Sequence, residues 1–447
     1  MIKKYIVLSF IILICLPFWT LAQTVKPNIL IILADDLGYH DVSYCGTTDV
    51  RTPNIDMLCK AGMRFDHFYV SPVCAPTRAS LMSGRYPEMV GVPGLIRSPI
   101  DANFGFLTPG TILLPELLKQ QEYHSALIGK WNLGFESPNK PNEKGFDVFH
   151  GFLEDMMEDY WTYVRHGKNF MRENDTEINP QGHATDLFTN WAVDYIKTQR
   201  ESKNPFFMYL AYNAPHYPIQ PKEEWVARIK KRQPGITDQR AKLLALIEHM
   251  DDGIGQVVKS LKETGKYNNT IILFLSDNGG DLPYGANNGP LKDSKGTLYE
   301  GGIRVPALAV WPGILKAGTV NNEKVLAMDI YPTLSEITGT QINHQIDGIS
   351  FLSILKGQTE KLTNRPVFFS RREGGIDFGG QTIQALILDD WKLLQNRPFQ
   401  PFELYNLKND PFEKENLIKT ESVRYKMMLQ LITKQIQKSG STPWQKP

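Results

Sequence analysis

Apolar runs alternate with amphipathic stretches along the first three quarters of the 447-residue chain. Short runs rich in Ile, Leu, Val and Phe predict buried strands at Asn28–Leu33, Tyr123–Ile128, Phe206–Tyr212, Thr270–Leu275 and Val305–Val310. Helical periodicity predicts helices at Thr111–Gln120, Ala184–Thr198, Gln239–Thr264 and Asp329–Thr338, the last ended by Gly339. This alternation predicts an α/β domain whose mostly parallel or mixed sheet is covered by helices on both faces.

The pattern changes after about Leu362. Three short apolar runs predict strands at Arg365–Phe369, Gln381–Leu388 and Trp391–Leu394, and a charged helix is expected from Glu421 to Lys438. We therefore expect a main domain over residues 23–361 and a smaller α+β subdomain over residues 362–447.

The first 22 residues have the pattern of an export signal. Lys3 and Lys4 precede the apolar stretch Tyr5–Phe18, and Thr20–Ala22 offers a small-residue cleavage site. An uncleaved membrane anchor is the alternative. Elsewhere no segment approaches the ~18 apolar residues that span a bilayer. We expect a periplasmic or secreted protein without stable membrane association once the signal is removed.

Charge and cysteine content narrow the possible partners. The 49 Lys and Arg residues nearly cancel the 48 Asp and Glu residues, and no long basic run occurs, so nucleic acid is not an expected partner. The cysteines are Cys15, Cys45, Cys59 and Cys74. Cys45 and Cys59 either pair as a disulfide or remain free thiols, and Cys74 is left over in the first case.

Polar residues follow four of the predicted strands. In chain order they are Asp35-Asp36, Lys130, Asn213–His216 and Asp277-Asn278. Ligands of open α/β sheets bind outside the carboxyl ends of the strands, so one shared site is expected there. Three carboxylates in one pocket would repel each other without a cation, and their oxygens with an amide oxygen suit Ca²⁺.

A further cluster begins at Cys74 and continues through Pro76 and Arg78. Pro76 suits the first turn of a helix, which would place Cys74 just before the helix N-terminus, where backbone N–H groups favour an anion. Arg78 can hold an oxyanion or a metal-bound carboxylate through charge-assisted hydrogen bonds.

This cluster, Cys74–Arg78 (CAPTR) followed by Leu81–Arg85 (LMSGR), resembles the signature of the type I sulfatases, in which the cysteine is oxidised to Cα-formylglycine. The resemblance extends over Asn28–Asp36 (NILIILADD), Arg51–Asp56 (RTPNID), Gly129–Gly134 (GKWNLG), Ala214–His216 (APH), Ser276–Gly280 (SDNGG), Lys295–Gly302 (KGTLYEGG) and Leu404–Pro411 (LYNLKNDP). It implies an alkaline-phosphatase-like large mixed sheet between helices, and a C-terminal subdomain with a short antiparallel sheet plus a helix.

Carried over residue by residue, the family pattern implies one calcium ion held by Asp35, Asp36, Asp277, Asn278 and the modified Cys74. It also implies that Arg78 and Lys130 hold the formylglycine and neutralise the sulfate, while His216 and Lys295 bind the sulfate and the bridging oxygen. His216 is the favoured proton donor to the leaving alcohol because the ordinary histidine pKa lies near neutrality. A formylglycine-generating or anaerobic sulfatase-maturating enzyme would be the expected partner.

One position departs from the family pattern. The family has histidine two residues after the lysine, and this chain has Asn132. Asparagine can form a hydrogen bond but cannot act as a base near neutral pH. We therefore expect that a proton-transfer step is slow or depends on another group.

The substrate is predicted from two stretches, Gly285–Leu291 and Asp36–Val42, that look similar to N-acetylgalactosamine-4-sulfatase-like members. They suggest a sulfated galactose or N-acetylgalactosamine in a glycan. Predicted sugar-contacting residues are Arg97, Trp161, Arg165, His166, Asn287 and Asn288, together with Tyr163. The aromatic stretch Tyr160–Tyr163 is equally explained by ordinary packing.

Two other functions fit the same residues. The first is a phosphate or phosphonate ester hydrolase of the same superfamily, although the sequence shows no spare His/Asp cluster for a second metal. The second is a decayed sulfatase that binds sulfated glycans without cleaving them, which Asn132 suggests and the remaining motif residues oppose.

Overall fold

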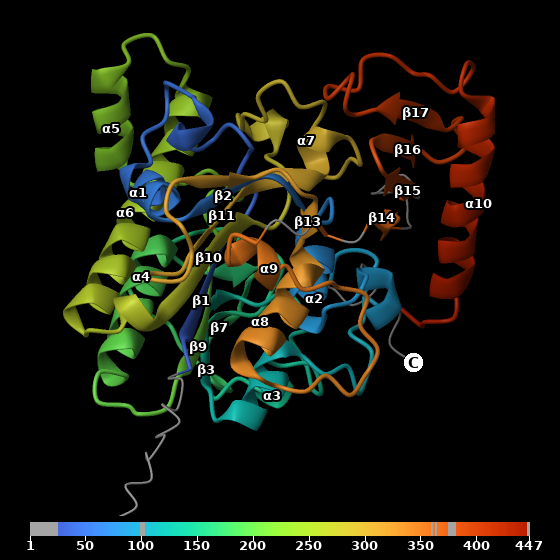
Figure 1. Ribbon diagram of the computed structural model, residues 1–447. Helices are drawn as coiled ribbons and strands as arrows, with labels where there is room; N and C mark the ends of the chain where they lie inside the picture. Colours follow the sequence, from blue (N-terminus) through green and yellow to red (C-terminus); the bar gives the residue numbers. More distant parts are fainter. Residues whose placement is uncertain (1–25, 99–102, 359–360, 363, 374–380, 445–447) are drawn as a thin grey trace, which may run out of the picture.

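The computed structural model describes residues 26–98, 103–358, 361–362, 364–373 and 381–444 (Figure 1). The export signal predicted over residues 1–22 lies outside these residues. Within them, no helix is long and apolar enough to cross a membrane.

The strands are β1 Asn28–Ala34, β2 Met63–Tyr69, β3 His124–Lys130, β4 Val148–Phe152, β5 Val164–Arg165, β6 Lys168–Asn169, β7 Met171–Glu173, β8 Thr176–Glu177, β9 Phe206–Ala211, β10 Thr270–Ser276, β11 Arg304–Val310, β12 Thr319–Asn321, β13 Val325–Leu326, β14 Val367–Glu373, β15 Gln381–Leu388, β16 Trp391–Gln395 and β17 Glu403–Asn406. The α-helices are α1 Pro53–Ala61, α2 Cys74–Ser83, α3 Leu114–Leu118, α4 Ala184–Thr198, α5 Glu223–Arg232, α6 Asp238–Glu263, α7 Glu300–Ile303, α8 Ile330–Thr338, α9 Leu352–Leu355 and α10 Ser422–Ser439.

One large mixed sheet forms the centre of the molecule. Its strand order is β12-β2-β11-β10-β1-β9-β3-β4-β7-β8, with β13 also paired to β2. The block β10-β1-β9-β3 is parallel throughout, whereas β11 runs antiparallel to both of its neighbours, β10 and β2. The carboxyl ends of four parallel strands therefore meet along one edge, which is the edge that the sequence predicted for the site.

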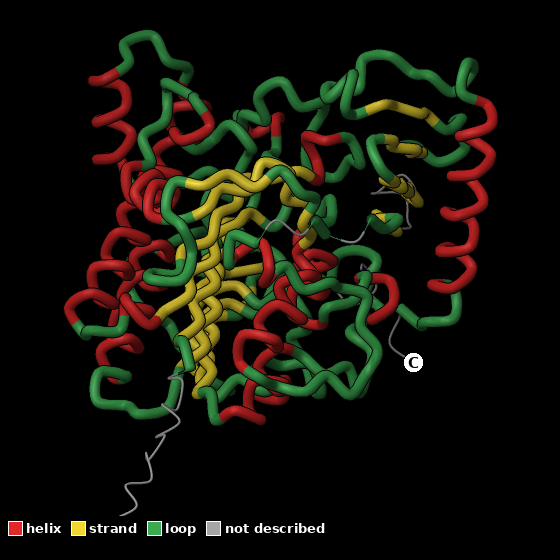
Figure 2. Tube along the Cα trace, viewed as in Figure 1, coloured by secondary structure: helices red, strands yellow, loops and turns green. Residues whose placement is uncertain are grey.

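Helices cover both faces of this sheet (Figures 1 and 2). On one face lie α4 and α6, with α1 and α5 packed against α6, and on the other lie α2, α3, α8 and α9. The strand β1 is buried along its whole length because both of its faces are covered. The predicted mixed sheet between two helical layers is confirmed.

Most predicted elements lie within a few residues of the observed ones, and two differences have clear causes. The helix α3 is shorter than the predicted Thr111–Gln120, because Pro115 lies in its first turn and a 3₁₀ turn, Lys119–Gln121, continues it. The strand β2 has an alternating sequence, MRFDHFY, and was not predicted; it lies between β11 and the short strands β12 and β13.

The C-terminal region forms a separate antiparallel sheet of order β14-β15-β16-β17, with α10 on its outer face. Alternate residues of β15 point in opposite directions: Ile383, Ala385 and Ile387 pack toward the large domain, and Leu386 packs toward α10. A small antiparallel sheet with a helix was predicted, and it is confirmed. The boundary after residue 361 stays a prediction, since the structure shows only that β14 begins at Val367.

Candidate active site

The predicted residues of the site converge at the carboxyl edge of the parallel block. Paired residues at the ends of β1 and β10 are Ala34 and Ser276, so the acidic residues that follow both strands lie at one level. The side chains that meet there are Asp35, Asp36, Cys74, Arg78, Lys130, His216, Asp277, Asn278 and Lys295.

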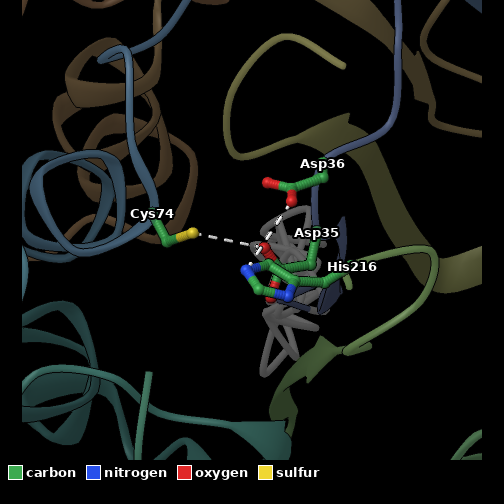
Figure 3. A group of neighbouring side chains, drawn as sticks. All are labelled: Asp35, Asp36, Cys74 and His216. Carbon is green, nitrogen blue, oxygen red and sulfur yellow. Dashed lines mark hydrogen bonds and ion pairs between the residues drawn. The ribbon is translucent and has the colours of Figure 1, made fainter. Parts of the chain in front are cut away.

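The helix α2 brings Cys74 and Arg78 into this group, and all ten of its residues are buried. Cys74 is the first helical residue, not the residue before the helix as the sequence suggested, because Val73 is the N-cap and Pro76 falls third in the first turn. The Cys74 thiol faces the β1 end, with Sγ 3.3 Å from Asp35 Oδ1 (Figure 3). Gly84 ends the helix with φ 69°.

Arg78 and Lys130 are fully buried cations that contact the same carboxylate. Lys130 Nζ donates to Asp35 Oδ2, and Arg78 Nη2 lies 3.5 Å from that oxygen. Arg78 also donates to Asp277 Oδ2 at 2.7 Å and to the Lys130 carbonyl at 3.1 Å. A buried charge requires a partner, and here each cation has at least one.

The opposite side of the site is formed by Asp36, Lys295 and His216. Lys295 Nζ lies 2.7 Å from Asp36 and 3.1 Å from His216 Nε2, and His216 Nε2 lies 3.6 Å from Asp36 Oδ2. His216 Nδ1 faces the Tyr217 carbonyl oxygen, so it carries the proton and leaves Nε2 toward the site. The Lys295 side chain is 15% exposed, which places this side of the cluster at the mouth of the site.

One oxygen in the group lacks a partner. Asn278 is fully buried and its Nδ2 donates to Asp36 Oδ1 at 2.8 Å, but its Oδ1 has no hydrogen bond. Unpaired buried polar atoms are uncommon because leaving one unsatisfied costs about 1–3 kcal/mol. Asp35, Asp36, Cys74 and His216 also present potential metal ligands within 4.8 Å of one another. The donor set therefore fits a divalent cation that prefers oxygen ligands.

The pKa directions follow from burial and from these neighbours. Burial raises the pKa of the Cys74 thiol well above its usual value, and Asp277 and Asp35 add to the effect. Burial also works against ionisation of Asp35, but Lys130, His216 and Arg78 hold its pKa below the usual range. Burial, followed by the charge of Asp35, raises the pKa of Asp277. An unmodified Cys74 is thus a protonated thiol at neutral pH and a weak nucleophile.

Asn132 lies beside the cluster with its side chain turned to the segment before Arg97. Its Nδ2 donates to the Ile96 carbonyl at 2.8 Å, and its Oδ1 is buried without a partner. Its φ of 56° lies in the left-handed region, which asparagine, aspartate and histidine tolerate better than most residues. The backbone at this position therefore accommodates either the observed asparagine or a histidine.

The predicted sugar-contacting residues differ in their surroundings: some are ion-paired and others are exposed. Arg97 is ion-paired with Glu373 at 2.9 Å, and Arg165 lies 3.1 Å from Asp155. Trp161 is 46% exposed, and His166 lies 3.6 Å from Glu158. Their contact with a sugar stays a prediction, as does that of the half-buried Asn287.

Two of the predicted residues are already bonded within the fold, and their contact with a sugar stays a prediction. Asn288 is buried, and its side-chain amide forms hydrogen bonds with backbone groups. Its Oδ1 accepts from the Gly280 N–H, and its Nδ2 donates to the Gly280 and Asp293 carbonyls. Its hydrogen-bonding capacity therefore shapes the loop and leaves little for a substrate. Tyr163 is also buried, and its hydroxyl donates to the Gly182 carbonyl. This arrangement agrees with the alternative that the aromatic stretch serves packing.

The structure brings together a second His/Asp group that the sequence did not show, namely His183, Asp186 and His249. It does not resemble a free metal site. His183 Nδ1 accepts from the Thr185 N–H while its Nε2 faces the Gln220 carbonyl, and Asp186 is already paired with Lys222 at 2.7 Å. Burial, followed by His249, lowers the pKa of His183 to about 4, so its imidazole is neutral.

Sequence reasoning also missed Tyr160, which fixes the loop that carries His216. The Tyr160 hydroxyl donates to the carbonyls of Asn213 and His216 at 2.7 and 2.9 Å. Nothing in the local sequence indicates this contact, because Tyr160 and His216 are far apart in the chain.

A disulfide between Cys45 and Cys59 was one of two predicted alternatives, and it does not form. Both residues are free thiols.

Comparison with known proteins shows relatives over most of the chain. Residues 27–340 match the family described as Sulfatase, and residues 293–441 match the one described as N-sulphoglucosamine sulphohydrolase, C-terminal. Arylsulfatase J of Mus musculus is 33% identical over 84% of this chain and 65% of its own length. N-acetylgalactosamine-6-sulfatase of Sus scrofa is 32% identical over 82% of this chain and 71% of its own length.

Solved structures agree with these relatives. The crystal structure of Ps i-CgsB in complex with k-i-k-neocarrahexaose superposes with a TM-score of 0.83 at 35% identity, covering 92% of both chains. A structure of a sulfatase from Bacteroides fragilis, at 22% identity and a TM-score of 0.74, shows the same fold. With the matched family covering well over half of its length, the chain belongs to the sulfatase family, whose members are enzymes that hydrolyse sulfate esters.

Proposed function

We propose that this protein hydrolyses the sulfate ester of a galactose or N-acetylgalactosamine unit in a sulfated glycan. The observation that carries the proposal is the cluster of three buried carboxylates and three cations around Cys74. The carbohydrate class is supported by two names: the N-acetylgalactosamine-6-sulfatases among the relatives and the neocarrahexaose bound to Ps i-CgsB. The sulfate position on the sugar is left to the substrate screen.

We infer that Asp35, Asp36, Asp277 and Asn278 hold one calcium ion together with the modified Cys74. The unpaired Asn278 Oδ1 supports this assignment, because a cation would supply the partner that the oxygen lacks. When bound, calcium and the formylglycine formed from Cys74 supply a polarised, hydrated aldehyde as the nucleophile. Burial raises the pKa of the Cys74 thiol, so the unmodified cysteine would itself be a poor nucleophile.

The remaining residues neutralise and orient an anionic substrate. Without the metal, the charges of three carboxylates and three cations cancel, so a divalent ion would give the site a net positive charge that favours a sulfate. Lys130, Arg78 and Lys295 are placed to stabilise negative charge that develops in the transition state. Such stabilisation acts more strongly in this buried site than in water.

His216, in the form that carries a proton on both ring nitrogens, is proposed as the proton donor to the leaving alcohol. Its Nδ1 is held by the Tyr217 carbonyl, so Nε2 points into the site beside Lys295 and Asp36. A general acid must reach the leaving oxygen directly, and Nε2 is at the mouth of the site where a sugar would leave. Tyr160 maintains this position by holding the His216 carbonyl.

The cellular setting and partners remain proposals. Export to the periplasm or outside the cell follows from the predicted signal over residues 1–22, and a formylglycine-generating or anaerobic sulfatase-maturating enzyme would act on Cys74. A sulfated glycan is the expected substrate, with no role for nucleic acid.

The first test is the mass of the tryptic peptide Phe65–Arg78 from protein produced with a formylglycine-generating enzyme. We expect an aldehyde in place of the Cys74 thiol, and release of sulfate from sulfated galacto-configured glycans. A Cys74→Ala variant should lose sulfate release by at least about a thousandfold, since it lacks the nucleophile. A persistent thiol, in conditions that convert a control sulfatase, would contradict the proposal.

The same protein preparation can distinguish the proposed sulfatase function from a phosphatase function and from a purely binding function. Rates on a sulfate and a phosphate ester of one leaving group are compared, and we expect the sulfate ester to be preferred. Glycan binding by the fully modified protein without any sulfate release would instead support the non-catalytic alternative.

A further inference from the structure

Two tyrosines that no prediction included, Tyr217 and Tyr284, form a close, tilted ring pair beside the catalytic cations. The ring centroids of Tyr217 and Tyr284 are 4.4 Å apart and the rings are inclined by 30°. Tyr217 is 42% exposed, and Leu282, two residues before Tyr284, is 42% exposed as well. The exposed Tyr217 ring is not needed to close the core and can contact a ligand.

The pair joins the two loops that carry His216 and Lys295. Tyr217 follows His216 directly, and its carbonyl oxygen holds His216 Nδ1. Tyr284 ends a 3₁₀ turn, Leu282–Tyr284, which is tied to the Lys295 loop by a hydrogen bond from the Leu282 N–H to Ser294 Oγ at 3.1 Å. The aromatic surface therefore lies at the side of the site where Nε2 of His216 meets Lys295.

A carboxylate accompanies this surface. Asp281 precedes the turn, is half-buried, and lies close enough to the site that its pKa, which burial raises, also responds to Asp36, Lys295 and His216. Among the described residues no hydrogen bond to the Asp281 carboxylate is formed, so both of its oxygens can accept hydrogen bonds from a ligand. An aromatic face next to a hydrogen-bond acceptor matches the two surfaces of a sugar ring, one lined by C–H groups and the other by hydroxyls.

We propose that Tyr217, Tyr284 and Asp281 form the subsite that holds the sugar ring bearing the sulfate. The ring's C–H face would pack on the tyrosine pair, and Asp281 would accept a hydrogen bond from a hydroxyl. A galacto-configured pyranose fits best, because its axial 4-hydroxyl leaves the opposite face with a continuous C–H surface. The inference rests on the proposed function, since it presupposes a carbohydrate sulfate.

The test compares alanine and phenylalanine variants at both tyrosines. The substrate is N-acetylgalactosamine 6-sulfate or a neocarrahexaose, whichever the wild-type protein desulfates. We expect Tyr217→Ala and Tyr284→Ala each to raise KM by about three- to tenfold with a smaller change in kcat, because a ring contact is lost. Tyr217→Phe and Tyr284→Phe keep the ring and should stay within about twofold of wild type.

Two measurements separate recognition of the sugar from support of the fold. Inorganic sulfate, used as an inhibitor, reaches only the charged pocket, so its inhibition constant should not change in the alanine variants. Phe399→Ala, which removes a fully exposed ring in the C-terminal subdomain, serves as the matched control with unchanged KM. Asp281→Asn should raise KM as well, by removing a charged acceptor.

Two results would overturn the inference: an unchanged KM in both alanine variants, or sulfate inhibition weakened by the same factor as KM. Either would leave the proposed function intact as long as the wild-type protein releases sulfate. If the wild-type protein releases none from any glycan, the proposed function itself has failed.

Discussion

Two of the buried charge clusters in the described part of the chain differ in how far they are closed to solvent. The docking cluster, Glu300, Lys392 and Glu413, lies between the large domain and the C-terminal sheet: Lys392 Nζ is 3.0 Å from Glu300 and 2.8 Å from Glu413. The Tyr69 hydroxyl donates to Glu300 at 2.9 Å, and the Glu300 N–H donates to Glu413 at 2.7 Å. This cluster is closed to solvent, with Lys392 completely buried, and among the described residues Glu413 Oε1 has no partner other than its ion pair with Lys392.

The active-site cluster, Asp35, Asp36, Asp277, Arg78, Lys130 and Lys295, has more charged residues but remains open to solvent on one side. Asn278 Oδ1 beside it is unpaired, and the Lys295 side chain is partly exposed. Burying a charge pair is expensive, so a sealed cluster serves mainly to fix how two parts of the chain fit together. An open cluster that keeps an unsatisfied oxygen retains the capacity to bind an ion and an anionic substrate. The comparison indicates that access to solvent, together with a neutral oxygen left free to bind a cation, distinguishes the site from a buried cluster that only joins two parts of the chain.

The largest effect expected from this contrast is on stability at the docking cluster. Lys392→Met leaves Glu300 and Glu413 buried together without a cation and should lower the free energy of unfolding by about 3–5 kcal/mol, measured in urea. Lys408→Met, at an exposed lysine of the same subdomain, is the control and should change it by less than about 0.5 kcal/mol.

The same substitution at the active-site cluster should behave differently. Lys130→Met should cost less stability than Lys392→Met, because Asp35 keeps Arg78 nearby, yet sulfate release should fall by at least about a hundredfold. Equal losses of stability at both positions would remove the distinction between a sealed and an open cluster.

The unpaired oxygen gives the next prediction. Asn278→Ala should weaken calcium binding by about 10–100-fold in titration calorimetry, by analogy with the loss of groups that support metal ligands. Chelation of calcium should lower the melting temperature of the wild-type protein, and excess calcium should restore it. Asn409→Ala, at an exposed position, is the control. Unchanged affinity in Asn278→Ala would show that the free oxygen is not a ligand.

Asp251 is a buried carboxylate that forms no ion pair among the described residues, so it shows how a buried carboxyl group behaves without the cations of the two clusters. Asp251 accepts N–H groups of Asn54 and Ile55, and burial raises its pKa to about 6. Because the folded pKa exceeds the unfolded value of about 3.9, the folded state binds more protons, and the stability contributed by protonated Asp251 is lost as pH rises from about 4 to about 6.

Replacement of this carboxyl by a neutral amide should remove that pH dependence. The free energy of unfolding of Asp251→Asn, relative to wild type, should increase by about 2–3 kcal/mol between pH 4 and pH 7. Denaturant unfolding at a series of pH values measures the difference. A constant difference would mean that Asp251 is ionised throughout, as Asp35 is beside its cations.

The smallest expected effect is at Asn132. If proton transfer at this position limits turnover, Asn132→His should raise kcat by about tenfold, since a positioned base contributes at least that much. The backbone φ of 56° tolerates histidine, so little loss of stability is expected. An unchanged kcat, with the melting temperature preserved, would mean that another step limits the reaction.

The sequence determined much of this protein. Continuous apolar runs identified β1, β3, β9, β10 and β11 because strands buried on both faces need apolar residues throughout. The polar residues after four of these strands were predicted to share one site, because the carboxyl ends of parallel strands lie at the same edge of a sheet. The residues of the CAPTR motif needed no structure to be singled out, since a cysteine and an arginine at a helix start form a recognisable local pattern.

Only the tertiary structure decided the features that depend on distant contacts. It inserted the alternating strand β2 beside β11, and it brought Glu373 of the C-terminal sheet to Arg97. It packed the Tyr217 ring against the Tyr284 ring, and it paired the Asn288 side chain with backbone groups. Local sequence records which residues favour a strand or a turn, whereas a contact between loops depends on how the sheet twists and where its helices pack. That information is spread over the whole chain, so these contacts emerge only when the fold is complete.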